Sequence, residues 1–92
     1  MIRSFRHRGL KRLHERGDAS GIQAAQKKRI LRILAYLDDA QSPRDVDFPG
    51  LRLHPLTGNL AGFWSLSVSG NWRVIFRFED SHVADVDLVD YH

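Results

Sequence analysis

The chain of 92 residues contains no cysteine and only three prolines. Without cysteine there is no disulfide framework, no thiolate nucleophile and no cysteine-ligated zinc, so packing alone must hold the fold together. No stretch of about eighteen apolar residues is present, as a membrane span would require, and the first residues lack the apolar run of a signal peptide. These absences predict a single cytoplasmic domain, residues 1–92, that makes no contact with a membrane.

Acidic residues are scarce in the first third of the chain. Residues 1–32 hold ten Lys/Arg against two Asp/Glu, a formal charge of +8, whereas the other 60 residues hold four against nine, a charge of −5. A strongly basic segment favours a polyanionic partner, because neutralising phosphates releases condensed counterions. A run of charge on a helix is as often a solvated face, so charge alone leaves both interpretations open.

The first half of the sequence predicts a short strand over residues 2–5 and two helices. Leu10 and Leu13 have helical spacing within residues 8–16, and Gly17 is suited to end that helix in a left-handed conformation. Ser20, with Gln23 three residues on, resembles a capping box and predicts the start of the second helix. The apolar stripe of that helix consists of Ile30, Ile33, Leu34 and Leu37. Residues 42–50 are predicted to be a loop.

The second half alternates apolar and polar residues with a period of two, which is typical of strands with one solvated face. The pattern predicts strands over residues 51–54, 64–68, 72–78 and 84–89, with Gly70-Asn71 in a type II′ hairpin turn. Trp72, Val74, Phe76 and Phe78 are predicted to face the helices, as are Ala84, Val86 and Leu88. We therefore expect an α+β fold with two N-terminal helices packed on one face of a twisted, mainly antiparallel sheet.

The opposite sheet face is predicted to be open and polar. It would carry Arg52, His54, Ser65, Ser67, Arg73 and Arg77, with Asp85, Asp87 and Tyr91 from the last strand. Planar guanidinium groups match phosphate oxygens in pairs, so a nucleic-acid backbone fits such a face. Alternatively, the arginines pair with aspartates on a neighbouring strand as surface ion pairs worth under about 1 kcal/mol each. We favour the ion pair for Arg77.

The last three residues, Asp90-Tyr91-His92, combine a carboxylate, a phenol and an imidazole. Metal-independent RNA cleavage must deprotonate a ribose 2′-hydroxyl, stabilise the crowded phosphate and protonate the leaving 5′-oxygen. Imidazoles at His54 and His92 suit the two proton transfers, and Arg73 suits the phosphate. A lone histidine is usually structural, and His7, His14 and His82 are assigned to packing or to the surface. The hypothesis requires His54 and His92 to converge.

Other chemistries have weaker support in the sequence. Asp85, Asp87 and Asp90, near His82 and His92, are compatible with an oxygen-rich Mg²⁺ site, but neighbouring arginines argue against it, and we expect no metal or cofactor. No glycine-rich phosphate loop, HExxH motif or Gly-x-Ser-x-Gly elbow occurs. Nucleotide hydrolysis, metalloproteolysis and esterase activity therefore lack a motif.

In this order and spacing, several segments resemble the HigB family of bacterial toxins, within the RelE superfamily. They are Met1-Ile2-Arg3-Ser4-Phe5, Leu53-His54-Pro55-Leu56 with Gly58, Trp64-Ser65, Asn71-Trp72-Arg73-Val74-Ile75-Phe76 and Asp90-Tyr91-His92. The resemblance implies a RelE-like microbial RNase fold and a ribosome-dependent endoribonuclease that enters the A site and cuts translated mRNA. It also implies a HigA-type helix-turn-helix antitoxin as partner, with DNA reached only through that antitoxin.

The resemblance places the active site at His54, Arg73, Asp90, Tyr91 and His92. Thr57 occupies a position where relatives often have a lysine, which implies less phosphate-binding charge there. We expect RNA and ribosome contacts from basic residues, namely Lys11, Arg12, Lys27, Lys28, Arg29, Arg32, Arg52 and Arg77. The competing hypothesis is a catalytically weak binding module that acts mainly as partner and co-repressor of the antitoxin.

Overall fold

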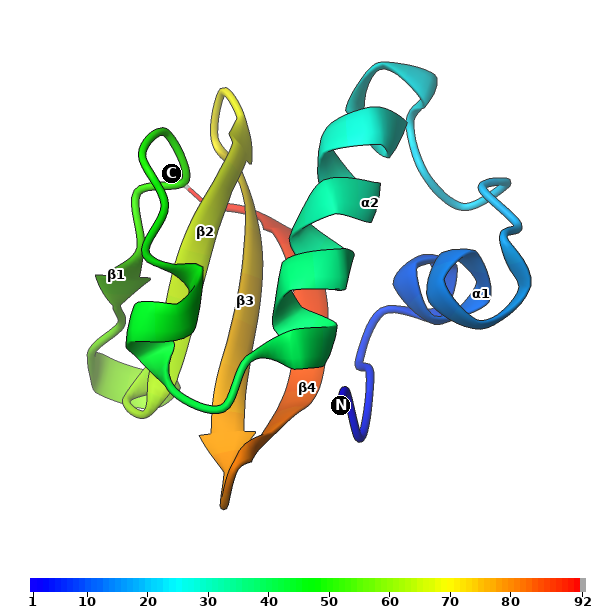
Figure 1. The fold of residues 1–92 in the computed structure, drawn as a ribbon. Helices are drawn as coiled ribbons and strands as arrows, with labels where there is room; N and C mark the ends of the chain where they lie inside the picture. The colour runs from blue at the N-terminus through cyan, green and yellow to red at the C-terminus, as the bar shows by residue number, and fades with distance from the viewer. Residues whose placement is uncertain (92) are drawn as a thin grey trace.

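The basic first half of the chain folds into two helices and the second half into a sheet, as the apolar spacing predicts (Figure 1). A computed structural model describes residues 1–91. The helices are α1 (Arg8–Arg16) and α2 (Ala24–Asp39), and the strands are β1 (His54–Pro55), β2 (Phe63–Ser69), β3 (Trp72–Glu79) and β4 (His82–Asp90). Two 3₁₀ turns, η1 (Pro43–Val46) and η2 (Gly58–Leu60), lie on either side of β1. None of the helices in the described part is long and apolar enough to cross a bilayer.

Helix α1 has the boundaries that its sequence predicts. Gly17 ends it with φ +70°, a left-handed conformation that only glycine adopts without strain. At the other end, Nδ1 of His7 accepts a hydrogen bond from the backbone N–H of Leu10 at 3.1 Å. Gly9 and Gly21 pack so closely that a Cβ on Gly9 would lie 2.8 Å from the carbonyl oxygen of Gly21. The contact fixes α1 against the segment that leads into α2.

Helix α2 begins later than the sequence suggests, so the predicted capping box at Ser20 is wrong. Its N-cap residue is Gln23, which makes no side-chain capping bond. The backbone N–H of Ser20 instead donates to the carboxylate of Asp18 at 3.0 Å, which holds residues 18–20 in a turn before the helix. The predicted stripe is correct: Ile30, Ile33, Leu34 and Leu37 are all buried.

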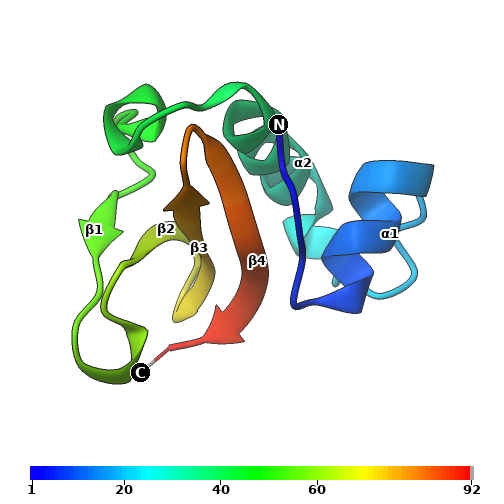
Figure 2. The same cartoon turned by 90° about the horizontal axis from the view of Figure 1, so that it is seen from below.

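The four strands form an antiparallel meander in the order β1-β2-β3-β4, so each strand pairs with the next along the chain. Gly70, at φ +53°, and Asn71 connect β2 to β3 as the two-residue turn that the sequence predicts. The sheet curls, and α1 and α2 lie together on one side of it (Figure 2). Helix α2 packs on β2, and α1 packs on α2 and β4. The predicted fold class is confirmed.

Two predicted strands are wrong in extent. Residues 2–5 form no continuous strand; only Ile2 and Phe5 make isolated parallel bridges, to Val83 and Val86 of β4. The strand predicted over residues 51–54 is reduced to His54–Pro55, because Arg52 has φ +53° and breaks the extended conformation. A left-handed conformation costs a residue other than glycine roughly 1–2 kcal/mol.

A bulge in β4 changes which of its side chains face the helices. Ile75 pairs with Asp87 and Arg77 with Ala84, so β4 contains one extra residue in this interval, and Asp85 has φ +55°. Because the bulge shifts the alternation, Val83 and Val86 both enter the main core. The prediction that Ala84 faces the helices is therefore wrong, since Ala84 is buried outside that core.

The sheet face away from the helices carries apolar side chains as well as the predicted polar ones, which corrects the prediction of a wholly open, polar face. The main core lies between the helices and the sheet, around Leu34, Val74 and Phe76. A second cluster of Leu56, Phe63 and Ile75 forms where the segment after β1 folds back over the sheet. The alternation along β3 predicts that Ile75 lies on this side of the sheet. It does not predict which segment covers Ile75, because that segment comes from elsewhere in the chain.

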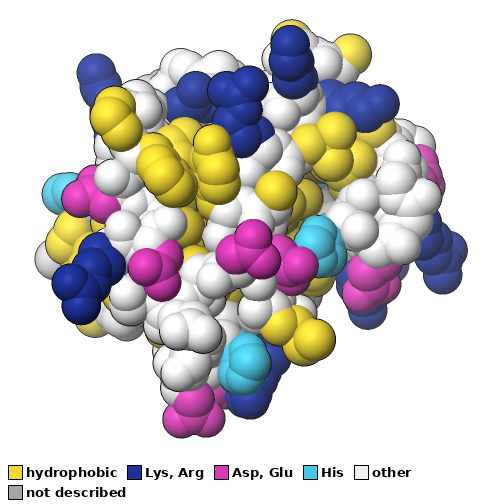
Figure 3. Space-filling model, in the orientation of Figure 1, with side chains coloured by type: hydrophobic (Ala, Val, Ile, Leu, Met, Phe, Trp, Pro, Cys, Tyr) yellow, Lys and Arg dark blue, Asp and Glu magenta, His cyan; other side chains and the backbone are white. Residues whose placement is uncertain are grey.

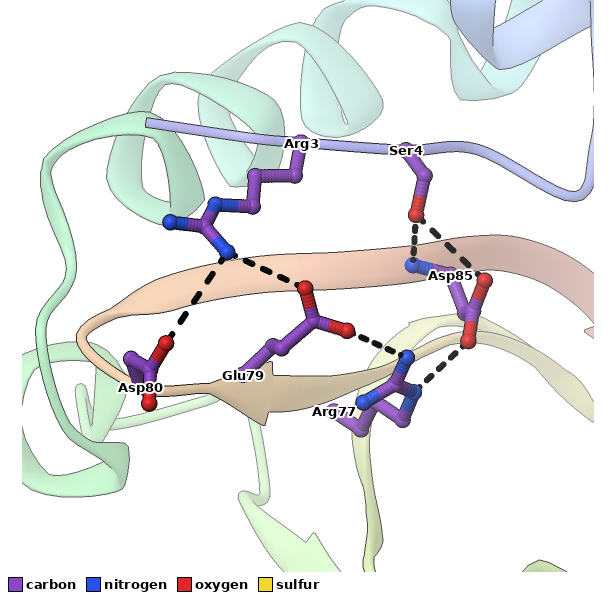
Figure 4. Close-up of polar contacts among 6 residues, drawn as sticks. All are labelled: Arg3, Ser4, Arg77, Glu79, Asp80 and Asp85. Carbon is purple, nitrogen blue, oxygen red and sulfur yellow. Dashed lines mark hydrogen bonds and ion pairs between the residues drawn. The ribbon is translucent and has the colours of Figure 1, made fainter.

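A chain of ion pairs joins the N-terminal segment to the β3–β4 hairpin (Figure 4). Nε of Arg77 donates to Asp85 at 2.6 Å and its terminal nitrogen to Glu79 at 2.9 Å, and Arg3 reaches Glu79 at 3.0 Å. The hydroxyl of Ser4 accepts a bond from the backbone N–H of Asp85 at 2.8 Å. The ion pair predicted for Arg77 with Asp85 is confirmed.

Stability at acid pH is expected to depend on Arg77. Its hydrogen bond lowers the pKa of Asp85 below the ordinary value of 3.8, and hydrogen bonds from Arg77 and then Arg3 lower the pKa of Glu79 below 4.5. Stability linked to a lowered carboxyl pKa is present above the ordinary value and is lost as the pH falls through the folded-state pKa. The free energy of unfolding should therefore decline below about pH 4.5, and less steeply in Arg77→Ala. Urea titrations between pH 2 and 7 measure both slopes, and equal slopes would contradict the assignment.

Candidate active site

A cavity of about 320 Å³ opens where β1, β2, β3 and the residue after β4 meet. Its lining consists of Arg52, Leu53, His54, Leu56, Ser65, Arg73 and Tyr91. Three of the five predicted active-site residues, His54, Arg73 and Tyr91, are thus brought to one place from positions far apart in the sequence. No Asp or Glu is found among these described lining residues, so their charge is positive.

The register of the antiparallel strands explains this convergence. His54 pairs with Ser65 between β1 and β2, and Arg73 pairs with Ser67 between β2 and β3. On the other side, the backbone N–H of Tyr91 donates to the carbonyl of Asn71 at 2.8 Å, which ties the end of the chain to the β2–β3 turn. Strand pairing therefore sets the spacing of the three side chains.

The Arg73 side chain is held in place by the backbone of its own turn. Its guanidinium donates to the carbonyl of Gly70 at 2.8 Å and to the carbonyl of Trp72 at 3.0 Å. A guanidinium has five N–H donors, so these bonds fix its plane and leave donors for a ligand. Oriented donors in a cavity can stabilise an anion without reorganising, which is the property that a reacting phosphate requires.

The other two predicted active-site residues are Asp90 and His92. Asp90 is exposed, ends β4 and pairs in register with Trp72, but it does not line the cavity. His92 lies outside the described residues, so its predicted role stays a prediction. Within residues 1–91, no three His, Asp or Glu side chains are grouped to hold a metal ion.

The predicted RNA-binding residues fall into four groups, one of which is Arg52 alone, in the lining of the first cavity. Lys11 and Arg12 line a second cavity of about 320 Å³ on α1, beside Arg8, Glu15 and Arg16. On α2, Lys27, Lys28 and Arg32 are exposed. In the view of Figure 3, basic side chains gather along the upper edge, near the N-terminal end of α2, and acidic ones lie mostly below them.

Arg29 and Arg77 have structural partners. Arg29 donates to the carbonyls of Ser67 at 3.0 Å and Gly50 at 2.8 Å, which joins α2 to the sheet and to the loop before β1. Arg77 is bound to Asp85 and Glu79. If Arg29 or Arg77 contacted RNA as predicted, its guanidinium would have to share or lose these bonds.

Sequence reasoning missed the apolar part of the site. Leu53 and Leu56 line the cavity, and Leu56 also belongs to the second apolar cluster, with Phe63 and Ile75. Ser65 also lines the cavity and is a buried polar residue, with 5% of its surface exposed. Its place in the alternation along β2 was the signal in the sequence that it faces this side of the sheet. Thr57 is exposed and outside the lining.

Residues 3–92 match the sequence profile of a family described as the RelE-like toxin of the type II toxin-antitoxin system HigB. The chain belongs to this family of HigB-like toxins. It is 39% identical over 92 residues to Endoribonuclease HigB of Proteus vulgaris, with all of both chains covered. It is also 37% identical over 60 residues to Toxin HigB-1 of Vibrio cholerae, which covers 64% of this chain and 63% of that relative.

A solved structure supports the fold. A chain of the YoeB-YefM complex from Staphylococcus aureus superimposes with a TM-score of 0.64 and 18% sequence identity, over 100% of this HigB-like toxin and 95% of the other chain. The predicted family and RelE-like fold are thereby confirmed. As a member of a type II toxin family, the chain has an antitoxin as its partner, and the full-length relative named as an endoribonuclease supports the predicted enzyme class.

Proposed function

We propose that this HigB-like toxin cleaves translated mRNA in the ribosomal A site by a metal-independent reaction in the bacterial cytoplasm. The observation that carries the proposal is the cavity that unites His54, Arg73 and Tyr91, since an imidazole and an oriented guanidinium are the groups that phosphodiester cleavage needs. The positive lining suits a polyanion, and the family relationship supplies the class of substrate.

In the proposed reaction, a ribose 2′-oxygen attacks the adjacent phosphorus and the 5′-oxygen of the next nucleotide leaves, which yields a 2′,3′-cyclic phosphate. One imidazole removes the 2′-proton and the other protonates the leaving oxygen, with His54 and His92 sharing these roles. Arg73 binds the non-bridging oxygens as charge accumulates. Tyr91 stacks on a base or donates a hydrogen bond, and Asp90 orients or charge-stabilises His92.

The exposed basic residues of α1 and α2 would bind ribosomal RNA. Lys11, Lys27, Lys28 and Arg32 suit this role by exposure and charge, because phosphate contacts do not depend on sequence and each adds to the salt dependence of binding. Arg12, which is partly buried and lies 3.8 Å from the carboxylate of Asp18, would join them. Arg52 would contact RNA from within the cavity. We assign Arg29 and Arg77 to the structural hydrogen bonds and ion pairs described above, and not to RNA binding. The antitoxin would be of the HigA type, with a helix-turn-helix that carries all binding to DNA.

Primer extension on mRNA from cells that express the chain without an antitoxin tests the proposal. We expect cuts within translated codons, and His92→Gln should weaken them at least tenfold, because a glutamine cannot exchange protons near neutral pH. Circular dichroism of the purified variant controls for folding. Strong cuts from a stably folded His92→Gln protein would exclude His92 from the chemistry.

The competing function, a binding module, predicts a different result. A toxin that acts mainly as partner and co-repressor of its antitoxin would give no cuts in translating cells, yet would still bind a co-expressed helix-turn-helix antitoxin. The family relationship is compatible with this alternative, whereas the assembled cavity favours the enzyme.

A further inference from the structure

Three residues other than glycine have a positive φ in the described chain: Arg52, Asp80 and Asp85. Local structure accounts for two of them. Asp80 lies in the turn between β3 and β4, and Asp85 forms the β4 bulge. Aspartate also tolerates this conformation, because its short side chain bonds locally. Arg52 has neither explanation: it lies in no hairpin turn, and its long side chain gains nothing from a left-handed backbone.

The backbone around Arg52 is held on both sides. Leu51 is buried, and its carbonyl accepts a hydrogen bond from the N–H of Ser67 at 2.7 Å. The guanidinium of Arg29 binds the carbonyl of Gly50 at 2.8 Å, and Leu53 packs on the main core. These neighbours keep position 52 left-handed. A glycine would satisfy the same geometry without steric strain, so the arginine side chain is the feature that remains unexplained.

The Arg52 side chain is exposed and lines the active-site cavity with His54 and Arg73. The cavity is thus lined by two arginines from opposite sides of β2, Arg52 before β1 and Arg73 on β3. Arg73 is anchored to the carbonyls of its own turn, whereas no hydrogen bond or ion pair of Arg52 is found among residues 1–91. A guanidinium is permanently charged and binds phosphate oxygens in pairs, so an arginine beside a cavity with no Asp or Glu among its described lining residues suits a second phosphate.

We propose that Arg52 is an RNA-binding residue of the active site, which contacts a backbone phosphate next to the scissile one, and that the left-handed backbone at position 52 is retained to present this side chain. The inference rests on the proposed RNA cleavage and specifies how the substrate is held. Arg52 acts in binding, and Arg73 acts at the reacting phosphate.

Single-turnover cleavage of a defined mRNA on purified ribosomes tests the assignment, with the toxin concentration varied. For Arg52→Gly we expect the half-saturating concentration to rise about tenfold, as loss of a charge-assisted hydrogen bond predicts, with a much smaller change in the maximal rate. The logarithmic salt dependence of binding should fall by about one, since one phosphate contact is lost. The thermal unfolding midpoint should stay equal or rise, because glycine removes the strain.

Two further variants make the result specific. Arg52→Lys keeps the charge and should recover part of the affinity. Asp80→Gly is the matched control, since it relieves a positive φ in a turn remote from the cavity and should leave cleavage unchanged. Wild-type half-saturation in Arg52→Gly would overturn the inference while leaving the proposed cleavage intact. Absence of cleavage by the unsubstituted toxin would overturn both.

Discussion

Replacing Arg73 by alanine is expected to lower the maximal rate of mRNA cleavage about a thousandfold, because removing one oriented donor from a developing oxyanion typically costs about 10²–10³ in rate. The Arg73 guanidinium is positioned by the carbonyls of Gly70 and Trp72 and lines the cavity with His54. Its removal leaves no oriented cation at that point. Single-turnover cleavage at saturating toxin measures the effect, and circular dichroism establishes that the variant is folded.

Arg77→Ala is the matched control, because Arg77 is an arginine on the same strand with the same parity. Its side chain is bound to Asp85 and Glu79 and does not line the cavity. The substitution should therefore reduce stability and leave the maximal cleavage rate within a few-fold of wild type. If both variants lost cleavage equally, or neither did, the distinction between a reacting-site arginine and a structural one would be wrong.

The largest loss of stability is expected from Phe76→Ala, at about 3–5 kcal/mol, which is the usual cost of truncating a buried phenylalanine. Phe76 is fully buried at 0% exposure in the main core and contacts the ring of Phe78 edge-on, with ring centroids 5.8 Å apart. A domain of this size has a total stability of roughly 5–15 kcal/mol, so the variant should be marginally folded. Urea denaturation followed by tryptophan fluorescence measures the change.

Phe48→Ala serves as the comparison, because Phe48 is 42% exposed, and its ring contacts that of Tyr36 at a centroid distance of 4.4 Å. We expect a loss of about 1 kcal/mol or less. A similar loss at both positions would mean that the main core contributes less than its burial indicates.

The proposed chemistry of this HigB-like toxin uses residues on strands rather than on long loops. His54 and Arg73 lie on β1 and β3, which both pair with β2, and Tyr91 is fixed to the β2–β3 turn by a backbone hydrogen bond. Side chains on a hydrogen-bonded sheet keep their relative positions, which favours a site that must hold several groups on one phosphodiester. The two-residue turn at Gly70-Asn71 also orients Arg73, so a structural signal and a functional one share a single short segment.

Local patterns in the sequence predicted the elements with short-range causes. The apolar stripe of α2, the glycine that ends α1 and the turn at Gly70 were all correct, because each depends on residues within a few positions of one another. The capping box at Ser20 failed because Asp18 competes for the same backbone N–H. The alternation in β4 failed at the bulge of Asp85, which inserts one residue that no local pattern marks.

By itself the sequence determined the family, the fold class and the inventory of chemical groups, since these follow from composition, periodicity and the order of short motifs. Only the tertiary structure decided which groups meet. It joined His54, Arg73 and Tyr91 in one cavity and placed Arg52 on a left-handed backbone beside the site. The physical reason is that strand register and the bonds that fix a loop act between residues distant in the chain, where sequence spacing gives no measure of separation.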